Sequence, residues 1–194
     1  GLKKDRKLVP TRWSLTATHD MIGKNLIKII KDYDTIDYMA FFGGYLGNYY
    51  VVLCFPEIWS YELFEMYAKN QNKYTTDYES HDGRKNYAEN TAGGYYTVRM
   101  SVLEKLRELK RQCSILALRF ITDEYTMPLG VWVTLEAARK SMNSNPIKFS
   151  SGELMIEYAR KLSLKKFNFN LNKILAKSIL LNQVKYQSKL IKFL

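Results

Sequence analysis

The feature that most constrains the fold of this chain is a nearly continuous apolar run over residues 113–121, CSILALRFI. A strand that is apolar at almost every position, instead of alternating, is typical of a strand covered on both faces of a sheet. Such a strand needs other elements packed on each side, so the run predicts a layered protein with a sheet in its middle. At 194 residues, the chain is long enough for one domain of this kind with a substantial core.

The other segments alternate between helical and strand-like patterns. Apolar spacing and capping residues predict helices that begin at Thr18 or Asp20 and end near residue 33, and further helices over residues 56–67, 95–110, 135–142, 150–162 and 171–181. Aromatic and β-branched runs predict strands over residues 36–42 and 49–55, with a Gly-rich turn between them. The polar stretch 69–93 predicts a long loop. The predicted fold class is α/β (mixed α+β), a single domain with a small mixed β-sheet flanked by helices.

The two cysteines, Cys54 and Cys113, lie in strongly apolar runs, VVLCF and CSILAL. A free thiol in such a run behaves as a small hydrophobic group, so both are predicted to be buried and reduced. His19 and His81 are the only histidines, and no spacing of soft ligands forms a zinc site. We therefore expect no metal bound through Cys or His and no cofactor, unless carboxylates gather around a divalent cation.

Positive charge is concentrated at the C-terminal end of the chain. The net charge is +11, but Glu157 is the last acidic residue and nine basic residues follow it, which leaves +2 for residues 1–157. Such a field favours a polyanion, and DNA is the preferred partner. An anionic membrane surface and a solvated face without a partner are the alternatives. The residues expected to contact the DNA backbone are Lys165, Lys166, Lys173 and Lys177.

The sequence predicts a domain over residues 1–165 and a basic helical tail over residues 166–194. No uncharged apolar run reaches 18 residues, and the charged N-terminus has no apolar segment behind it, so no transmembrane segment or signal peptide is predicted. A cytoplasmic protein is expected. The chain opens without a methionine, which suggests a fragment or a processed form.

The last eight residues, QSKLIKFL, have the spacing of a short docking peptide. Leu190 and Phe193 are three residues apart, so a 3₁₀ turn would place them on one face, with Leu194 beside them and Gln187 near a polar pocket. This pattern resembles the motif by which replication and repair proteins bind the sliding clamp, PCNA. The alternative is the end of an amphipathic helix whose apolar residues rejoin the core.

Several longer stretches carry a resemblance to a known family. They are DRKLVPTRWS at residues 5–14, YLGN at 45–48, DGRKNYAEN at 82–90, GYY at 94–96, and RQ at 111–112 continued by PLGVW at 128–132. With these stretches the chain resembles the C-terminal domain of the archaeal Nre DNA-repair family. The resemblance implies a cytoplasmic DNA-damage protein attached to the clamp, without supplying a reaction. The chain departs from the family in having no N-terminal cysteine cluster, in His19-Asp20 where an acidic pair is expected, and in lacking an Arg before Glu136.

Polar residues in or near these stretches form the candidate functional cleft. They are Arg12, Trp13, Asp20, Asp82, Arg84, Glu89, Arg99, Arg111 and Glu136. Carboxylates and guanidinium groups together can bind a phosphodiester and supply a general base, with a divalent cation. Each residue can equally be structural, because Asp-Gly is a common turn and arginines often form structural ion pairs. Whether the chain is an enzyme is therefore left open.

Exposed aromatic residues suggest a second kind of contact. Stacking platforms for single-stranded bases could come from Tyr49-Tyr50, Tyr95-Tyr96, Trp13, Trp59 and Trp132. Most of these aromatic residues are expected in the core, and the exposed subset is expected to be Arg12, Trp13, Arg84 and Arg99. No P-loop, nucleophile elbow, dinucleotide fingerprint or HExxH motif occurs. Two functions follow from the sequence: a DNA-binding repair module recruited to PCNA, and, as the alternative, a DNA-processing enzyme with an Asp/Glu/Arg site.

Overall fold

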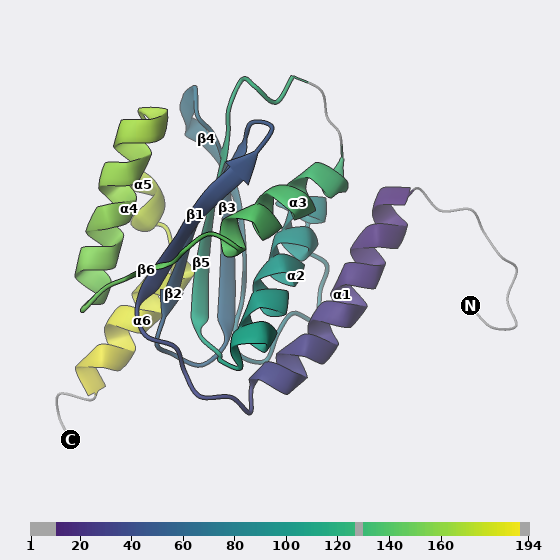
Figure 1. Cartoon of the computed structure of the whole chain (residues 1–194), viewed down its shortest axis with the longest axis vertical. Helices are drawn as coiled ribbons and strands as arrows, with labels where there is room; N and C mark the ends of the chain where they lie inside the picture. The colour runs from purple at the N-terminus through teal and green to yellow at the C-terminus, as the bar shows by residue number, and fades with distance from the viewer. Residues whose placement is uncertain (1–10, 127–129, 191–194) are drawn as a thin grey trace, which may run out of the picture.

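The computed structural model describes residues 11–126 and 130–190, with side chains for residues 13–126 and 130–185. Its helices are α1 (Thr11–Ile30), α2 (Ala92–Leu109), α3 (Val131–Met142), α4 (Gly152–Phe167), α5 (Asn172–Leu175) and α6 (Ile179–Leu190). Its strands are β1 (Met39–Tyr45), β2 (Asn48–Phe55), β3 (Ser60–Tyr67), β4 (Asn70–Glu79), β5 (Ser114–Ile121) and β6 (Ile147–Lys148). Figure 1 shows the strands gathered between two groups of helices.

All the strands named above belong to one sheet in the order β4-β3-β5-β2-β1-β6. Strand β3 pairs with β5 in parallel, and the other neighbouring strands pair antiparallel, so the sheet is mixed as predicted. Strand β5 is central and is buried at every position except its last, Ile121. The prediction that this apolar run forms a strand covered on both faces is confirmed.

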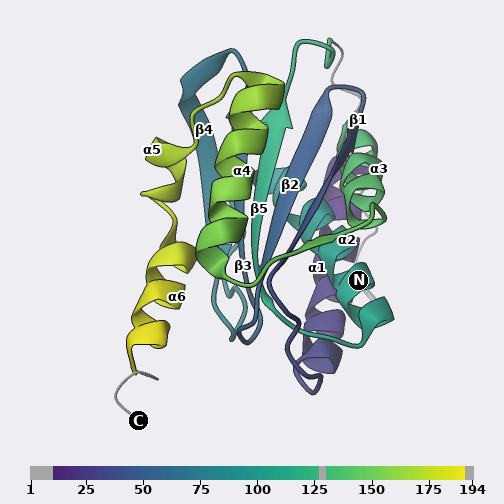
Figure 2. The same ribbon diagram turned by 60° about the vertical axis from the view of Figure 1, so that its left-hand side comes forward.

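Each face of the sheet carries its own helical layer and its own core. Helices α1, α2 and α3 cover one face, where Leu26, Val98 and Leu135 join a buried cluster with residues of the sheet. Helices α4, α5 and α6 cover the other face, where Phe169 and Leu180 join a second cluster. Figure 2 shows the two layers on opposite sides of the strands.

The predicted strand, turn, strand unit is confirmed as the β1–β2 hairpin, although its turn is tighter than expected. Only Leu46 and Gly47 separate the paired Tyr45 and Asn48, and both have positive φ, 45° and 73°. Positive φ at both central residues is the requirement of a type I′ turn, which matches the twist of the flanking strands. A Cβ at Gly47 would also collide with the backbone of Tyr125.

The predicted helix over residues 56–67 is wrong, because this region contains the strand β3. Tyr61 and Leu63 point into one core cluster, whereas Phe64 and Met66 point into the other. A strand that is apolar on both faces has no period of two, so its apolar spacing resembles that of a helix. The predicted loop over residues 69–93 is also wrong in its first part, where the edge strand β4 is polar because it is largely exposed.

Several helix boundaries differ from the expected ones. Helix α1 begins at Thr11, and Thr18 lies inside it, donating a hydrogen bond to the Ser14 carbonyl. Helix α4 is capped by Ser151, one residue later than expected, whose Oγ accepts from the Leu154 amide. Helix α3 is helical from Val131 onward, and β6 was not predicted.

The single helix expected over residues 171–181 is wrong. Helix α5 ends at Leu175 and α6 begins at Ile179, since Ser178 and the carboxylate of Glu62 cap the first turn of α6. In the region of the expected tail, the structure buries five apolar residues in the second core cluster: Phe169, Leu171, Ile174, Leu180 and Leu181.

Both cysteines are free and fully buried, as predicted. Burial raises the pKa of the Cys113 thiol, and the neighbouring Cys54 thiol raises it further. The two residues lie in the core cluster beneath α1, α2 and α3. They therefore act as small apolar core residues.

Candidate functional site

A buried arginine, Arg99 of α2, joins three elements of the fold. Its Nη1 lies 2.8 Å from Oε2 of Glu79 on β4, and its Nη2 lies 2.6 Å from Oδ1 of Asp20 on α1. The side chains of Arg99 and Glu79 are 1% and 0% exposed. A Cβ at Gly23 of α1 would be 3.1 Å from Nη2 of Arg99. The absence of a side chain at this position therefore allows the Arg99 guanidinium to pack closely against α1.

Asp20 is the partly exposed end of this ion cluster. Its Oδ2 accepts a hydrogen bond of 2.7 Å from Lys24, one helical turn further along α1. Burial alone would raise the pKa of Asp20, but the hydrogen bonds from Lys24 and Arg99 lower it below its ordinary value. The carboxylate therefore stays ionised at neutral pH. Two carboxylates and two cations leave the cluster with no net charge.

Above this cluster lies a pocket of about 400 Å³, named here the aromatic pocket, which is lined by Trp13, Thr16, Ala17, Asp20, Tyr87 and Tyr96. Trp13 and Tyr87 are 57% and 50% exposed, whereas Tyr96 is buried. The rings of Tyr87 and Tyr96 stack with centroids 5.2 Å apart. The Arg99 guanidinium lies 5.2 Å from the centroid of the Tyr96 ring. The pocket thus combines aromatic surfaces with one ionised carboxylate.

Arg84 holds the loop that carries Tyr87. Its guanidinium donates to the carbonyl oxygens of Tyr78, Asn86 and Tyr87, at 3.0, 3.2 and 3.1 Å. It also lies 3.1 Å from Oδ1 of Asp77, a buried carboxylate on β4. These contacts fix the backbone of the loop, so that Tyr87 is held against the pocket.

The structure brings together four of the predicted cleft residues. Trp13 and Asp20 line the aromatic pocket, Arg99 lies beneath it, and Arg84 orders the adjoining loop. Arg12 belongs to α1, but its side chain lies outside the described residues.

The other predicted cleft residues do not line the aromatic pocket. Asp82 is exposed in a turn closed by a hydrogen bond from the Gly83 amide to the Ser80 carbonyl, and Glu89 is exposed on the same loop. Arg111 donates to the Lys110 carbonyl after α2, and Glu136 pairs with Arg139 on α3. Within the described ranges, no group of three or more His, Cys, Asp or Glu side chains is arranged to hold a metal ion. The carboxylates of the enzyme hypothesis therefore do not converge.

Sequence reasoning missed the two carboxylates on β4. Asp77 and Glu79 are two residues apart, so both point to the same face of the strand and meet Arg84 and Arg99. Acidic residues at alternate positions of a strand are a recognisable signal. The acidic pair is not recognised as part of a strand from the sequence, because the polar composition of residues 69–93 is typical of a loop.

A second buried arginine, Arg119, connects β5 with β2, β3 and α3. Arg119 of β5 donates to Oδ1 of Asn48, to Oγ1 of Thr134 at 3.3 Å and to Oε1 of Glu65 at 2.5 Å. A Cβ at Gly94 would collide with the Glu65 carboxylate. A buried polar network thus ties α3 to the sheet, and Asn48 and Gly94, from two family-like stretches, lie at it.

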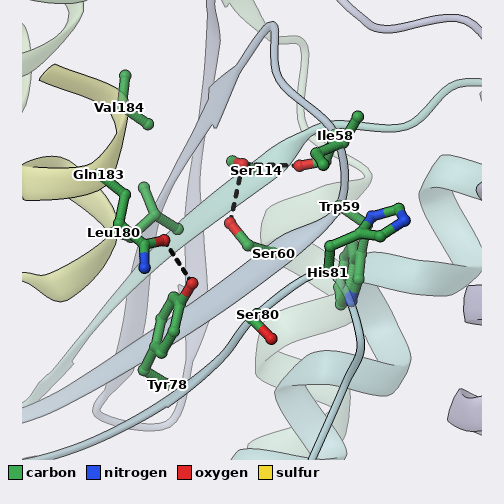
Figure 3. Close-up of a pocket in the computed structure, with 10 residues that line it drawn as sticks. All are labelled: Ile58, Trp59, Ser60, Tyr78, Ser80, His81, Ser114, Leu180, Gln183 and Val184. Atoms are coloured by element: carbon green, nitrogen blue, oxygen red, sulfur yellow. Dashed lines mark hydrogen bonds between the residues drawn. The ribbon is translucent and has the colours of Figure 1, made fainter. Parts of the chain in front are cut away.

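Another pocket, of about 400 Å³, lies between the sheet and α6 (Figure 3). Ser60 donates to Ser114, which donates to the Ile58 carbonyl, and Tyr78 reaches Gln183 of α6 at 2.5 Å. None of the side chains lining this pocket is an acid, a lysine or an arginine. It is therefore a weaker candidate for contact with a charged polymer.

The four lysines expected to contact DNA are all exposed. Lys165 and Lys166 end α4, Lys173 lies on α5, and Lys177 follows it. Lys173 donates to Oδ1 of Asn72 at 3.4 Å. Among the described side chains, none of the four is paired with a carboxylate.

The clamp-binding motif falls at the edge of the described chain. Gln187 and Leu190 belong to α6, where only the backbone is described, and Phe193 and Leu194 lie outside the described residues. No helix in the described ranges is both long and apolar enough to cross a bilayer.

Two family models match this sequence. The model for the archaeal Nre C-terminal region matches residues 79–193, and the model for the archaeal Nre N-terminal region matches residues 1–72. The first region contributes β5 to the sheet, whereas the second contributes β1, β2 and β3. Because β5 pairs with both β2 and β3, the two regions form one sheet here.

Curated proteins with similar sequences are named as DNA repair proteins. NreA of Archaeoglobus fulgidus is 39% identical over 158 residues, which are 78% of this chain and 40% of that protein. NreA of Haloferax volcanii is 36% identical over 72% of this chain and 36% of its own length. NreB of Archaeoglobus fulgidus is 34% identical over 92% of this chain and 46% of its own length. The chain thus spans less than half the length of these relatives, and no solved structure matches it.

Proposed function

Because the chain belongs to the archaeal Nre family, we propose that it is a cytoplasmic DNA-repair protein that binds DNA through surface lysines and is recruited to PCNA by its C-terminal peptide. The names of the relatives NreA and NreB support a role in DNA repair. The clamp motif and the basic C-terminal region support the two modes of attachment.

The observation that carries the DNA-binding proposal is the unpaired positive charge at the end of α4 and around α5. Glu157, the last acidic residue of the chain, pairs with Arg160 and Lys161. Lys165, Lys166, Lys173 and Lys177 follow, all exposed; the first three lie on α4 and α5, and Lys177 lies in the turn between α5 and α6. Such a surface attracts a phosphate backbone without reading its sequence.

Replacing these four lysines by Gln tests the DNA contact. Each lysine that touches a phosphate of duplex DNA contributes about −0.9 to the slope of log K against log salt. We expect the fourfold variant to bind a duplex more weakly, with a slope reduced by about 3 to 4. Fluorescence anisotropy over a salt series measures both quantities.

A control of equal charge change separates local contact from net charge. Lys28, Lys31, Arg107 and Lys110 lie at the ends of α1 and α2, in the opposite helical layer. Their replacement by Gln should leave the slope nearly unchanged. Equal losses in both variants would refute the lysine surface as the DNA contact.

The clamp contact is tested by calorimetric titration of PCNA with the full chain and its variants. Leu190 and Phe193 are the expected apolar anchors, and truncating such an anchor to Ala costs about 2 kcal/mol. Phe193→Ala should therefore weaken binding by roughly thirtyfold. Ser188→Ala, at a motif position that is not an anchor, is the matched control and should bind like the wild type.

Deleting residues 187–194 should abolish clamp binding and leave thermal unfolding nearly unchanged. The buried contacts of α6, at Leu180 and Leu181, precede the deleted residues. Unchanged clamp affinity after the deletion would show that the motif is coincidental, and a large loss of stability would show that its apolar residues belong to the core.

A further inference from the structure

We propose that the aromatic pocket receives one unstacked nucleobase of single-stranded DNA, with the amino-bearing edge of the base turned toward Asp20. The proposal rests on the DNA-binding function proposed above and adds a site on the other helical layer. Three observations support it: Trp13 and Tyr87 are exposed, hydrogen bonds from Arg84 fix the loop that carries Tyr87, and the charges around Asp20 are balanced.

Trp13 is more than half exposed and Tyr87 is half exposed. Large aromatic side chains such as these are usually mostly buried. They line one pocket of about 400 Å³, which lies within the range of roughly 300 to 1,000 Å³ typical of small-ligand sites. Exposed aromatic surfaces stack on bases without regard to sequence. The pocket therefore offers stacking surfaces of the right kind and size.

The pocket is formed before any ligand enters it. Arg84 fixes the loop through three backbone carbonyls, and the Ala88 amide donates to the Tyr96 hydroxyl at 2.9 Å. Tyr87 stacks on Tyr96, which is itself buried. A ligand would thus find its platform in place, which lowers the entropic cost of binding.

The surrounding charges favour a neutral planar ligand over a cation or an anion. A cation would gain little, because Lys24 and Arg99 already balance the carboxylates of Asp20 and Glu79. The Tyr96 ring also already carries the Arg99 guanidinium, so a second cation over it would be repelled. An anion would face the ionised Asp20. A nucleobase avoids both penalties.

Asp20 gives the pocket a preference among bases. An ionised carboxylate only accepts hydrogen bonds, and each of its oxygens has a free lone pair beside its contact with Arg99 or Lys24. Cytosine presents an N4 amino donor, whereas thymine presents the O4 acceptor at the same position. We therefore expect cytosine to be favoured over thymine.

The test uses single-stranded oligo(dC) and oligo(dT) of about twelve nucleotides, within the site sizes of single-strand binders. Trp13→Ala and Tyr87→Ala should each weaken oligo(dC) binding by about tenfold, the lower part of the range for base stacking. The salt slope should not change, because no phosphate contact is removed. Trp13→Phe retains a ring and should bind within a few-fold of the wild type.

Tyr67→Ala is the matched control, since Tyr67 is an exposed aromatic residue at the opposite end of the β3–β4 pair from Glu79. It should bind like the wild type. Intrinsic fluorescence supplies a second readout: oligo(dC) should quench the emission of Trp13, and this quenching should disappear in Trp13→Phe.

Asp20→Asn should reduce the preference for oligo(dC) over oligo(dT) while leaving Trp13 quenching in place. If Trp13→Ala and Tyr87→Ala bind oligo(dC) like the wild type while the fourfold lysine variant is weakened, the base pocket is refuted and the DNA-binding function stands. If the wild type binds neither oligonucleotide at low salt, the base pocket is refuted; if it also fails to bind the duplex, the DNA-binding function is refuted as well.

Discussion

The two helical layers differ in where their charged side chains lie and in whether these side chains are paired. On the face covered by α1, α2 and α3, Arg99 is buried between Asp20 and Glu79, and Arg139 makes two hydrogen bonds to Glu104. On the face covered by α4, α5 and α6, four exposed lysines, Lys165, Lys166, Lys173 and Lys177, form no pair with a carboxylate among the described residues. Buried pairs fix side-chain geometry, and exposed cations produce a long-range field. The first layer is thus suited to recognising a shape, and the second to attracting a polyanion.

The largest expected effect comes from breaking the buried ion cluster. Arg99→Leu leaves Glu79 without its cation in a fully buried position, and such a change costs about 3 to 5 kcal/mol. Arg160→Leu removes an exposed pair with Glu157 and should cost less than about 1 kcal/mol. Urea unfolding of both variants measures the contrast, and equal costs would contradict the distinction between the layers.

The next effect concerns Glu62, a buried carboxylate that caps a helix of the second layer. Glu62 accepts hydrogen bonds from the Ser178 hydroxyl and from the amides of Ile179 and Leu180. Glu62→Leu leaves these donors unsatisfied, which should cost about 1 to 3 kcal/mol and speed hydrogen exchange in α6. Glu108→Leu, at an exposed position, is the control. Unaltered exchange in α6 would show that the cap does not hold this helix.

A smaller effect should appear with pH on the first layer. Burial and the nearby Arg139 lower the pKa of His19 below its ordinary 6.5, although Glu104 opposes the shift. Below pH 6.5 the unfolded chain therefore binds more protons than the folded one, so the free energy of unfolding decreases as the pH is lowered. Unfolding curves between pH 7.5 and 5 should show this fall in the wild type, and less of it in His19→Gln. Parallel curves would refute it.

The smallest effect on stability should come from the exposed lysines. Replacing Lys165, Lys166, Lys173 and Lys177 by Gln should change the free energy of unfolding by about 0.5 kcal/mol or less per site, as for surface positions without special contacts. The same variant should lose DNA affinity. A large loss of stability would mean that these cations have a structural role.

How far the sequence predicts this molecule depends on which interactions are local. The apolar run of β5, the β1–β2 hairpin and α2 were predictable because each pattern is contained in one segment. Strand β3 was not, since burial on both faces removes the alternation that identifies a strand. The mixed sheet followed from the order of these elements.

The candidate site could be predicted from the sequence less completely than the fold. Arg99 meets Asp20 from 79 positions away and Glu79 from 20 positions away. No spacing rule connects such partners. Trp13, Arg84 and Arg99 were identified in or near family-like stretches, whereas Asp77 and Glu79 became visible as site residues only when the chain was folded.

The cap on α6 has a mechanical consequence. Because Glu62 of β3 secures the first turn of α6, a load applied to the end of this helix passes directly into the sheet. A partner that binds at the C-terminal end of α6 would therefore be connected to the sheet through this cap, which restricts how the domain can be oriented beside it.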